Sequence, residues 1–321
     1  MRTPHRIGLI ASITAIVLSG CGGGSSGEDA APAAQTRTVT STFTGKEVKV
    51  PAEPKRVVAL WRTGAELVDL GVKPVGALDG ELLEEELGSE VYATVKDTPE
   101  IGTFEGVDVE KVIELEPDLI IGMDNGGLRI DYEELEEIAP TVVLKIAEPP
   151  DVWANYPTLA EIVGEETDFD KNQAELERDL KAVDQEFGGA IGDLESTSIG
   201  SFDGPIFVDT TKSLIVERIL LAGFGYNPDY SDKPKRYVEE LSAENIANLA
   251  DQDVIFYDVG LDGEPSPATQ KVLDLASFKR LPAARAGHVF PLTSGTIYTF
   301  DGGQRQADDL RTAAEKLAEE G

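Results

Sequence analysis

The sequence contains one cysteine, two histidines and few basic residues, and each of these shortages excludes a class of protein. A single cysteine cannot form a disulfide framework. With 28 basic against 60 acidic residues and a net charge of -32, the chain has no basic face for nucleic acid, and an anionic membrane surface would repel it. Hydrophobic residues make up 41% of the 321, which is enough for a buried core. We therefore expect a folded protein of about two domains.

Residues 1–20 are typical of an export signal. Arg2 and Arg6 precede an apolar run over residues 7–18, which is too short to span a membrane, and small residues follow it. Leu18-Ser19-Gly20-Cys21 resembles the lipobox of bacterial lipoproteins, a resemblance that implies lipidation of Cys21 and a new N-terminus there. A plain secretory signal with an incidental cysteine is the alternative. Residues 21–38 are rich in glycine, serine, alanine and proline and are predicted to be a flexible tether.

Short apolar runs alternate with helical patterns along the rest of the chain, and they do so twice. In the first half, strands are predicted at residues 56–60, from 72, at 119–122 and at 141–144, with helices at 65–70, 109–115 and 132–138. In the second half, strands are predicted at 205–208 and 254–257, with helices at 213–222 and 243–249. This order predicts an α/β fold with an N-terminal lobe over residues 39–150 and a C-terminal lobe over 191–321, each built on a parallel sheet.

The segment between the lobes, residues 151–190, contains no strand-like run. Apolar residues recur with helical spacing from Phe169 to Phe187 amid many charges. This pattern predicts one long amphipathic helix that joins the lobes as a stiff connection, with a ligand cleft between them.

Ligands of open parallel sheets bind beyond the carboxyl ends of the strands. The loops expected there contain aromatic, arginine and amide groups, which suit a bulky polar organic ligand. These loops are residues 61–63, 79–80, 123–127, 257–258 and 293–300.

Catalysis and metal binding find little support in the sequence. His288 is the one histidine beyond the signal, no Gly-x-Ser-x-Gly motif occurs, and residues 122–127 lack the lysine of a phosphate loop. A site for free Zn²⁺ or Mn²⁺ would draw on several histidines or cysteines. We therefore predict no catalytic residue, no metal site and no cofactor.

From about Arg56 to Leu317 the chain resembles the periplasmic-binding-protein family that serves ABC importers of iron-siderophores, haem and cobalamin. The order and spacing of the matching runs carry the resemblance. The fold of that family, two α/β lobes joined by one long helix with the ligand clamped between them, agrees with the layout predicted above. The matching runs are residues 56–61, 71–76, 101–103, 109–121, 132–144 and 281–291.

The resemblance implies a binding protein that captures a ferric siderophore, with the hydroxamate type favoured because Trp61 resembles an aromatic of hydroxamate binders. Haem and cobalamin are the alternatives within the family, and Met123 or a tyrosine would have to ligate haem iron. The ligand-binding residues that the resemblance and the loops imply are Trp61, Arg62, Thr103, Phe104, Asn125, Arg129, Arg236, Tyr237, Tyr257, Tyr298 and Phe300.

The resemblance also implies partners and a location. Glu110 and Glu217 match the surface glutamates with which the two lobes of such proteins dock on the permease. We expect a monomer that is lipid-anchored on the extracytoplasmic face of a bacterial cell membrane, where it works with an ABC permease and its ATPase. From other classes, an extracytoplasmic α/β hydrolase that uses His288 and a structural surface lipoprotein with a degenerate cleft remain open.

Overall fold

The computed structural model describes residues 35–202 and 204–320, so the predicted signal and Cys21 lie outside the described residues. The described chain begins with a hairpin of β1 (Thr36–Ser41) and β2 (Lys46–Pro51). The predicted tether therefore overlaps β1 at its C-terminal end. None of the helices in the described ranges is both long and apolar enough to cross a membrane.

The N-terminal sheet is entirely parallel, in the order β4 (Gly76–Ala77), β3 (Val57–Ala59), β7 (Leu119–Asp124) and β8 (Thr141–Lys145). All six residues of β7 are buried, which explains the apolar run that predicted this strand. A small hairpin of β5 (Gly102–Thr103) and β6 (Gly106–Val107) stands apart from the sheet. The helices of this half are α1 (Gly64–Asp69), α2 (Glu84–Val95), α3 (Val109–Glu114) and α4 (Tyr132–Glu136).

Two side-chain caps explain where the last two of these helices begin. The carboxylate of Asp108 accepts a hydrogen bond from the backbone N–H of Lys111 at the start of α3. The carboxylate of Asp131 likewise accepts from the backbone N–H groups of Glu133 and Glu134 at the start of α4. Each cap satisfies backbone donors that would otherwise lack a partner.

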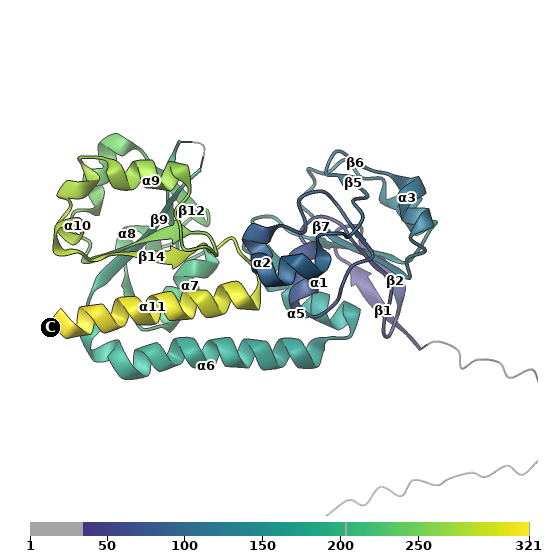
Figure 1. The fold of residues 1–321 in the computed structure, drawn as a ribbon, viewed down its shortest axis with the longest axis horizontal. Coiled ribbons are helices and arrows are strands. Elements are labelled where there is room, and N and C mark those ends of the chain that lie inside the picture. The colour runs from purple at the N-terminus through teal and green to yellow at the C-terminus, as the bar shows by residue number, and fades with distance from the viewer. Residues whose placement is uncertain (1–34, 203, 321) are drawn as a thin grey trace, which may run out of the picture. The chain divides into compact units, whose positions relative to one another are not determined.

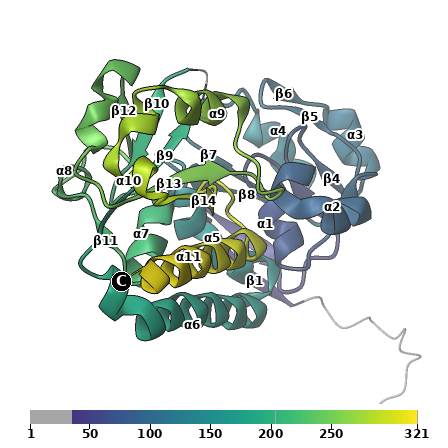
Figure 2. The ribbon, with the colours of Figure 1, turned by 60° about the vertical axis from the view of Figure 1, so that its left-hand side comes forward.

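The connecting segment consists of α5 (Asp151–Val163) and α6 (Glu166–Ile191). With 26 residues, α6 is about 39 Å long at 1.5 Å per residue, and it contains the predicted amphipathic helix. Figures 1 and 2 show α11 (Phe300–Glu320) lying alongside α6. A Cβ atom on Gly303 would lie 2.7 Å from a methyl group of Leu176, so the two helices approach closely where α11 has glycine.

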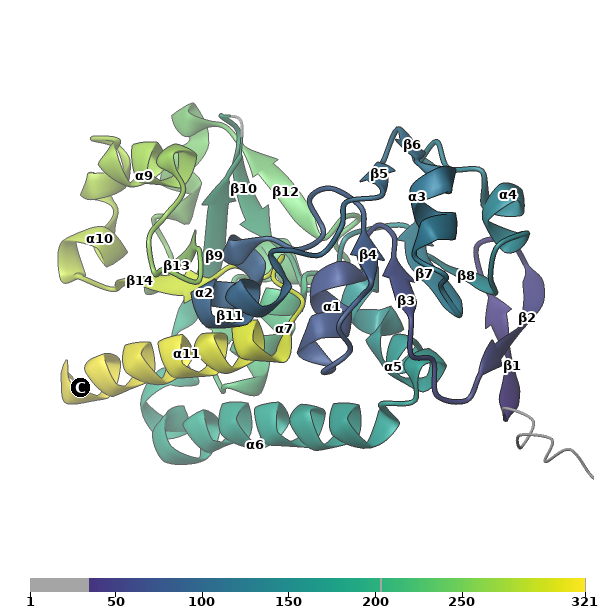
Figure 3. The same ribbon diagram turned by 45° about the vertical axis from the view of Figure 1, so that its right-hand side comes forward.

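The C-terminal sheet has the order β12 (Val238–Leu241), β10 (Ile206–Asp209), β9 (Glu195–Ser201), β13 (Val254–Val259) and β14 (Val289–Thr293), and β11 (Gly225–Tyr226) also pairs with β9. Strands β9, β11, β13 and β14 are parallel, whereas β10 runs antiparallel to its neighbours β9 and β12 (Figure 3). The predicted α/β class with two sheets and a long joining helix is confirmed, and the antiparallel β10 is an addition that makes the second sheet mixed.

The remaining helices of this half are short. The predicted helix at residues 243–249 is a 3₁₀ helix, η1 (Ala243–Leu249). The others are α7 (Leu214–Leu221), α8 (Pro228–Ser231), α9 (Pro267–Asp274), η2 (Phe278–Arg280) and α10 (Pro282–Ala286).

An aromatic cluster joins the connecting helices to the start of α11. The ring of Tyr156 stacks on that of Phe300, with 5.3 Å between ring centroids, and Trp153 and Phe169 meet both rings edge-on. The hydroxyl of Tyr156 and the backbone N–H of Phe300 both donate to the carboxylate of Asp69 at the end of α1. The aromatic cluster (Trp153, Tyr156, Phe169 and Phe300) therefore ties α1, α5, α6 and α11 together.

Candidate functional site

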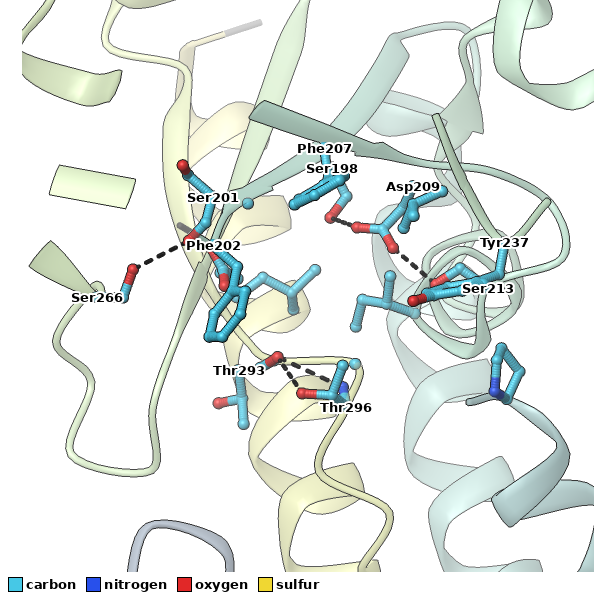
Figure 4. A pocket seen from close by; sticks show the side chains of 18 of the residues that line it. Ser198, Ser201, Phe202, Phe207, Asp209, Ser213, Tyr237, Ser266, Thr293 and Thr296 are labelled. Carbon is cyan, nitrogen blue, oxygen red and sulfur yellow. Dashed lines mark hydrogen bonds between the residues drawn. The ribbon is translucent and has the colours of Figure 1, made fainter. Parts of the chain in front are cut away.

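A cavity of about 390 Å³ lies against the C-terminal sheet, toward the carboxyl ends of β9, β13 and β14 (Figure 4). This is the position at which α/β sheets bind ligands. Pro150, just before α5, is its one lining residue from outside the C-terminal half among the residues that the structure describes. Serine and threonine hydroxyls, aromatic rings and two aspartates make up most of the wall. We call this space the sheet cavity.

The first aspartate, Asp209, ends β10 and is held by two serine hydroxyls. Ser198 of β9 and Ser213, which precedes α7, each donate to a different oxygen of the Asp209 carboxylate, both at 2.8 Å (Figure 4). The Asp209 side chain is half-buried, and burial raises the pKa of its carboxyl group to about 6, while the two serine hydrogen bonds oppose the rise and the negative charge of Asp258 adds to it. Asp209 is therefore ionised at neutral pH and becomes protonated in mild acid.

The second aspartate, Asp258, lies on β13, on the other side of β9. Its carboxylate accepts a hydrogen bond of 2.8 Å from the hydroxyl of Thr269, and burial raises its pKa against the effect of that bond. A Cβ atom on Gly200 would lie 2.9 Å from this carboxylate, so the glycine in β9 leaves the space that Asp258 occupies. In the described part of the chain, neither Asp209 nor Asp258 has a cationic side chain within ion-pair distance.

Aromatic side chains also line the sheet cavity. Phe207, Tyr237 and Tyr298 line it, as does Phe202, whose side chain is 77% exposed. Burial raises the pKa of Tyr298, and the positive charge of Arg62 opposes this rise, so Arg62 lies within electrostatic range of the Tyr298 hydroxyl. Ring faces beside hydroxyls and carboxylates suit an organic ligand with both apolar and polar surface.

Of the ligand-binding residues predicted in the C-terminal half, Tyr237 and Tyr298 line the sheet cavity. The other three lie elsewhere. Phe300 belongs to the aromatic cluster described above. Tyr257 is half-buried against the apolar core on β13, and Arg236 is exposed, with its backbone carbonyl accepting a hydrogen bond from Thr210.

The predicted residues of the N-terminal half form two groups that do not line the sheet cavity. In the first, Trp61 and Arg62 follow β3, and the guanidinium of Arg62 lies 5.8 Å from the centre of the Trp61 ring and 3.7 Å from a carboxylate oxygen of Glu86. Arg62 adopts a φ of 58°, which is uncommon for a residue other than glycine. The charge of Arg62 acts on Tyr298 of the sheet cavity.

The second group lies at the hairpin of β5 and β6. Thr103 ends β5, and the neighbouring Phe104 is 57% exposed and accepts a backbone hydrogen bond from Arg129. The guanidinium of Arg129 pairs with Glu105 at 3.2 Å. The side-chain oxygen of Asn125 accepts from the backbone of Gly127 and so shapes the loop after β7. The structure thus brings Phe104 and Arg129 together.

Two buried glutamates near Arg62 were not predicted. The carboxylate of Glu81 accepts from the backbone N–H groups of Thr63 and Gly64, at 3.0 and 3.1 Å, where α1 begins. Glu66 in α1 is also buried, and burial raises the pKa of Glu66 to about 8 and that of Glu81 to about 7, with the charge of Glu81 adding to the rise at Glu66. The sequence gives no sign of this pair, because glutamate side chains are ordinarily exposed.

Other residues of the sheet cavity are not among the predicted ligand-binding residues. Asp209 follows a predicted strand directly, and Asp258 and Thr293 lie in loops that were expected at the strand ends. The rule that ligands bind beyond the carboxyl ends of strands, here called the carboxyl-end rule, could therefore have found all three. Ser198 gave no such signal, because β9 itself was not predicted.

His288 lies away from the sheet cavity. Its ring nitrogens contact the backbone oxygen of Asp253, at 3.2 Å, and the carboxylate of Glu320, at 2.9 Å. Met123 is fully buried in β7. In residues 35–202 and 204–320, no group of three or more histidine, cysteine, aspartate or glutamate side chains is placed to hold a metal ion.

Glu110 and Glu217, the predicted docking residues, are both exposed on helices, in the first turn of α3 and on α7 respectively. Each is followed three positions later by an exposed aliphatic side chain, Ile113 at 54% and Leu220 at 45%. Positions three apart are neighbours on a helix surface, so each glutamate has an apolar neighbour.

Comparisons with known proteins agree with this fold. Residues 60–296 match the model of a family described as periplasmic binding protein. The petrobactin-binding protein YclQ of Bacillus subtilis is 27% identical over 310 residues, 92% of each chain, and the iron(3+)-hydroxamate-binding protein YxeB of the same organism is 26% identical over 321 residues, 94% of each. Among solved structures, the siderophore periplasmic binding protein from the fuscachelin gene cluster of Thermobifida fusca is similar with a TM-score of 0.72 at 24% identity, covering 83% of this chain and 98% of that one. Because the family model spans well over half of the sequence, the chain belongs to the periplasmic binding protein family, as its resemblance predicted.

Proposed function

We propose that the protein is the substrate-binding component of an ABC importer and that it captures a ferric siderophore. The observation that carries this proposal is the sheet cavity, which offers rings and hydroxyls to an organic ligand at the ligand-binding edge of an α/β sheet. A siderophore supplies all the ligands of its own iron, so the protein needs none. The names of the relatives YclQ and YxeB, which bind petrobactin and iron(3+)-hydroxamates, support the same ligand class.

The charge of the sheet cavity favours the hydroxamate type. Three hydroxamate groups neutralise Fe³⁺, whereas three catecholate groups leave a complex with three negative charges. Asp209 and Asp258 would repel such an anion, and no lysine, arginine or histidine is among the described residues that line the cavity. Like charges at a poorly solvated interface cost several kcal/mol, so an uncharged or cationic complex fits better.

The alternatives to siderophore binding are hydrolysis and haem binding, and the residues of the sheet cavity bear on both. Members of this family are binding proteins, and His288, on which a hydrolase would depend, is not among the described residues that line the sheet cavity. Haem is the stronger alternative, because Tyr237 and Tyr298 line the sheet cavity and a tyrosine oxygen can ligate haem iron.

The proposal is tested by tryptophan fluorescence during titration with ferric hydroxamates, ferric catecholates, haem and cobalamin. Trp61 lies beside Arg62, whose charge acts on Tyr298 of the sheet cavity, so a coloured ferric complex bound there is expected to quench emission. We expect saturable quenching by ferric hydroxamates at micromolar concentration or below, and none by the iron-free hydroxamates, which serve as the control. Saturation by haem alone would replace the proposal with its alternative, and no response to any siderophore would contradict it.

We further propose that Cys21 carries a lipid that anchors the protein on the extracytoplasmic face of the cell membrane. From there it would work as a monomer and present its ligand to a permease and ATPase complex. In this proposal Glu110 and Glu217 dock on basic sites of the permease, and their exposed neighbours Ile113 and Leu220 add apolar contact.

Charge reversal tests the docking proposal. Glu110→Arg and Glu217→Arg are each expected to reduce uptake of the ferric siderophore about tenfold in cells while leaving its binding to the isolated protein unchanged. Glu90→Arg, on the exposed face of α2, is the matched control and should leave uptake as it was. Normal uptake by the double variant would rule out docking through these glutamates.

A further inference from the structure

We propose that Asp209 and Asp258 are specificity-determining residues that recognise a protonated amine on the siderophore. This inference rests on the proposed function and extends it. The sheet cavity would receive an ammonium-bearing arm of a ferric complex whose iron centre is itself uncharged, and the two carboxylates would bind the ammonium group.

The strand register places both carboxylates on one face of the sheet, on either side of β9. Val208 and Tyr257 are both paired with Ile199 of β9. Strand β10 runs antiparallel to β9, so Asp209 lies beside Ser198. Strand β13 runs parallel to β9, so Asp258 lies beside Gly200. Alternate residues of a strand point to the same face, so the two aspartates straddle β9 on the cavity side.

Both carboxylates retain capacity to accept further hydrogen bonds. Each oxygen of Asp209 accepts one serine hydroxyl, and one oxygen of Asp258 accepts the hydroxyl of Thr269. A carboxylate offers about four acceptor sites in all, so an ammonium group, with three donors, could be bound without breaking the serine contacts. Gly200, which lacks a side chain, leaves the space in which the Asp258 carboxylate lies against β9.

Two half-buried carboxylates without a cationic partner leave negative charge in the cavity that a bound cation would stabilise. The structure offers no metal cluster at this place within the described residues. The rings of Phe207, Tyr237 and Tyr298, which line the same space, would add cation–π attraction for an ammonium or amidinium group. An amine of the ligand therefore satisfies the electrostatics, the hydrogen bonding and the shape of this wall together.

The inference is tested with two ligands that differ only in one charge. Ferrioxamine B is a ferric trihydroxamate with a free ammonium group, and acetylation of that amine gives the same complex without the charge. By calorimetric titration we expect the wild-type protein to bind ferrioxamine B about tenfold more tightly than the acetylated complex. Asp209→Asn and Asp258→Asn should each reduce this preference severalfold by weakening binding of ferrioxamine B and leaving the acetylated complex unaffected.

The exposed Asp193, in the turn between α6 and β9, provides the control, because Asp193→Asn removes the same charge away from the cavity and should keep the preference. The comparison of ferrioxamine B with its acetylated form uses the wild-type protein, so it does not depend on whether any variant folds. Equal binding of the two complexes by the wild-type protein would overturn the inference while leaving the hydroxamate proposal intact. Binding of neither complex by folded protein would overturn both.

Discussion

Replacing Phe300 with alanine is expected to lower the free energy of unfolding by about 3–5 kcal/mol, the usual cost of deleting a buried aromatic ring. Phe300 is only 5% exposed, and its ring contacts three other aromatic rings, those of Trp153, Tyr156 and Phe169. In a chain of this size such a loss should lower the melting temperature by roughly 10 °C. Thermal unfolding followed by circular dichroism measures it.

The Phe300→Ala result also decides between two roles for this residue, since the sequence analysis predicted a ligand contact. Phe104→Ala is the control, because Phe104 is also a predicted ligand residue but is 57% exposed, and its loss should change stability by no more than about 0.5 kcal/mol. If Phe300→Ala kept the wild-type melting temperature and lost siderophore binding, the structural role assigned here would be wrong and the ligand contact would stand.

Replacing Glu66 with glutamine is expected to stabilise the protein at pH 8 by about 4 kcal/mol, and by less than about 1 kcal/mol at pH 5. Burial raises the pKa of Glu66 to about 8 in the folded protein, from an ordinary value of 4.5. Between these two values the folded state holds a proton that the unfolded state has lost, so wild-type stability falls as the pH rises from about 4.5 to 8. Glutamine keeps the shape of the protonated side chain and cannot ionise.

Denaturant unfolding at several pH values measures this effect. The difference between Glu66→Gln and wild type should grow steadily with pH, and Glu90→Gln, at an exposed position of α2, should run parallel to wild type throughout. Glu81, which has a pKa raised to about 7, contributes a slope of the same sign to both proteins. A constant difference across the pH range would show that Glu66 is not held protonated by burial.

The alternation of strands and helices could be predicted from the sequence wherever the strands are apolar. The strand β7 is buried on both faces and therefore reads as an unbroken apolar run, and α6 shows its buried side through regularly spaced apolar residues. By contrast β9, with the sequence Glu-Ser-Thr-Ser-Ile-Gly-Ser, was not predicted although it lies at the centre of its sheet. Its polarity has a physical reason, because Ser198 and Ser201 face the sheet cavity instead of an apolar core.

The candidate site could be predicted only in part, because residues from distant segments of the chain form it. The carboxyl-end rule led to the loop that contains Tyr298, and the family resemblance led to Tyr237, and both residues line the sheet cavity. The partners of Asp209 come from β9 and from the start of α7, segments far apart in the chain that only the folded structure brings together. Burial of Glu66 and Glu81 likewise depends on packing and leaves no trace in the residue pattern.

The position of the iron in a crystal of the protein grown with a ferric trihydroxamate would show whether the sheet cavity binds the siderophore. Anomalous scattering at the iron absorption edge identifies that atom independently of the model of the ligand. We expect one strong iron peak at the sheet cavity, on the side of Tyr237 and Tyr298, with only siderophore oxygens as iron ligands. An iron bound directly by protein side chains, or a ligand bound away from the sheet cavity, would contradict it.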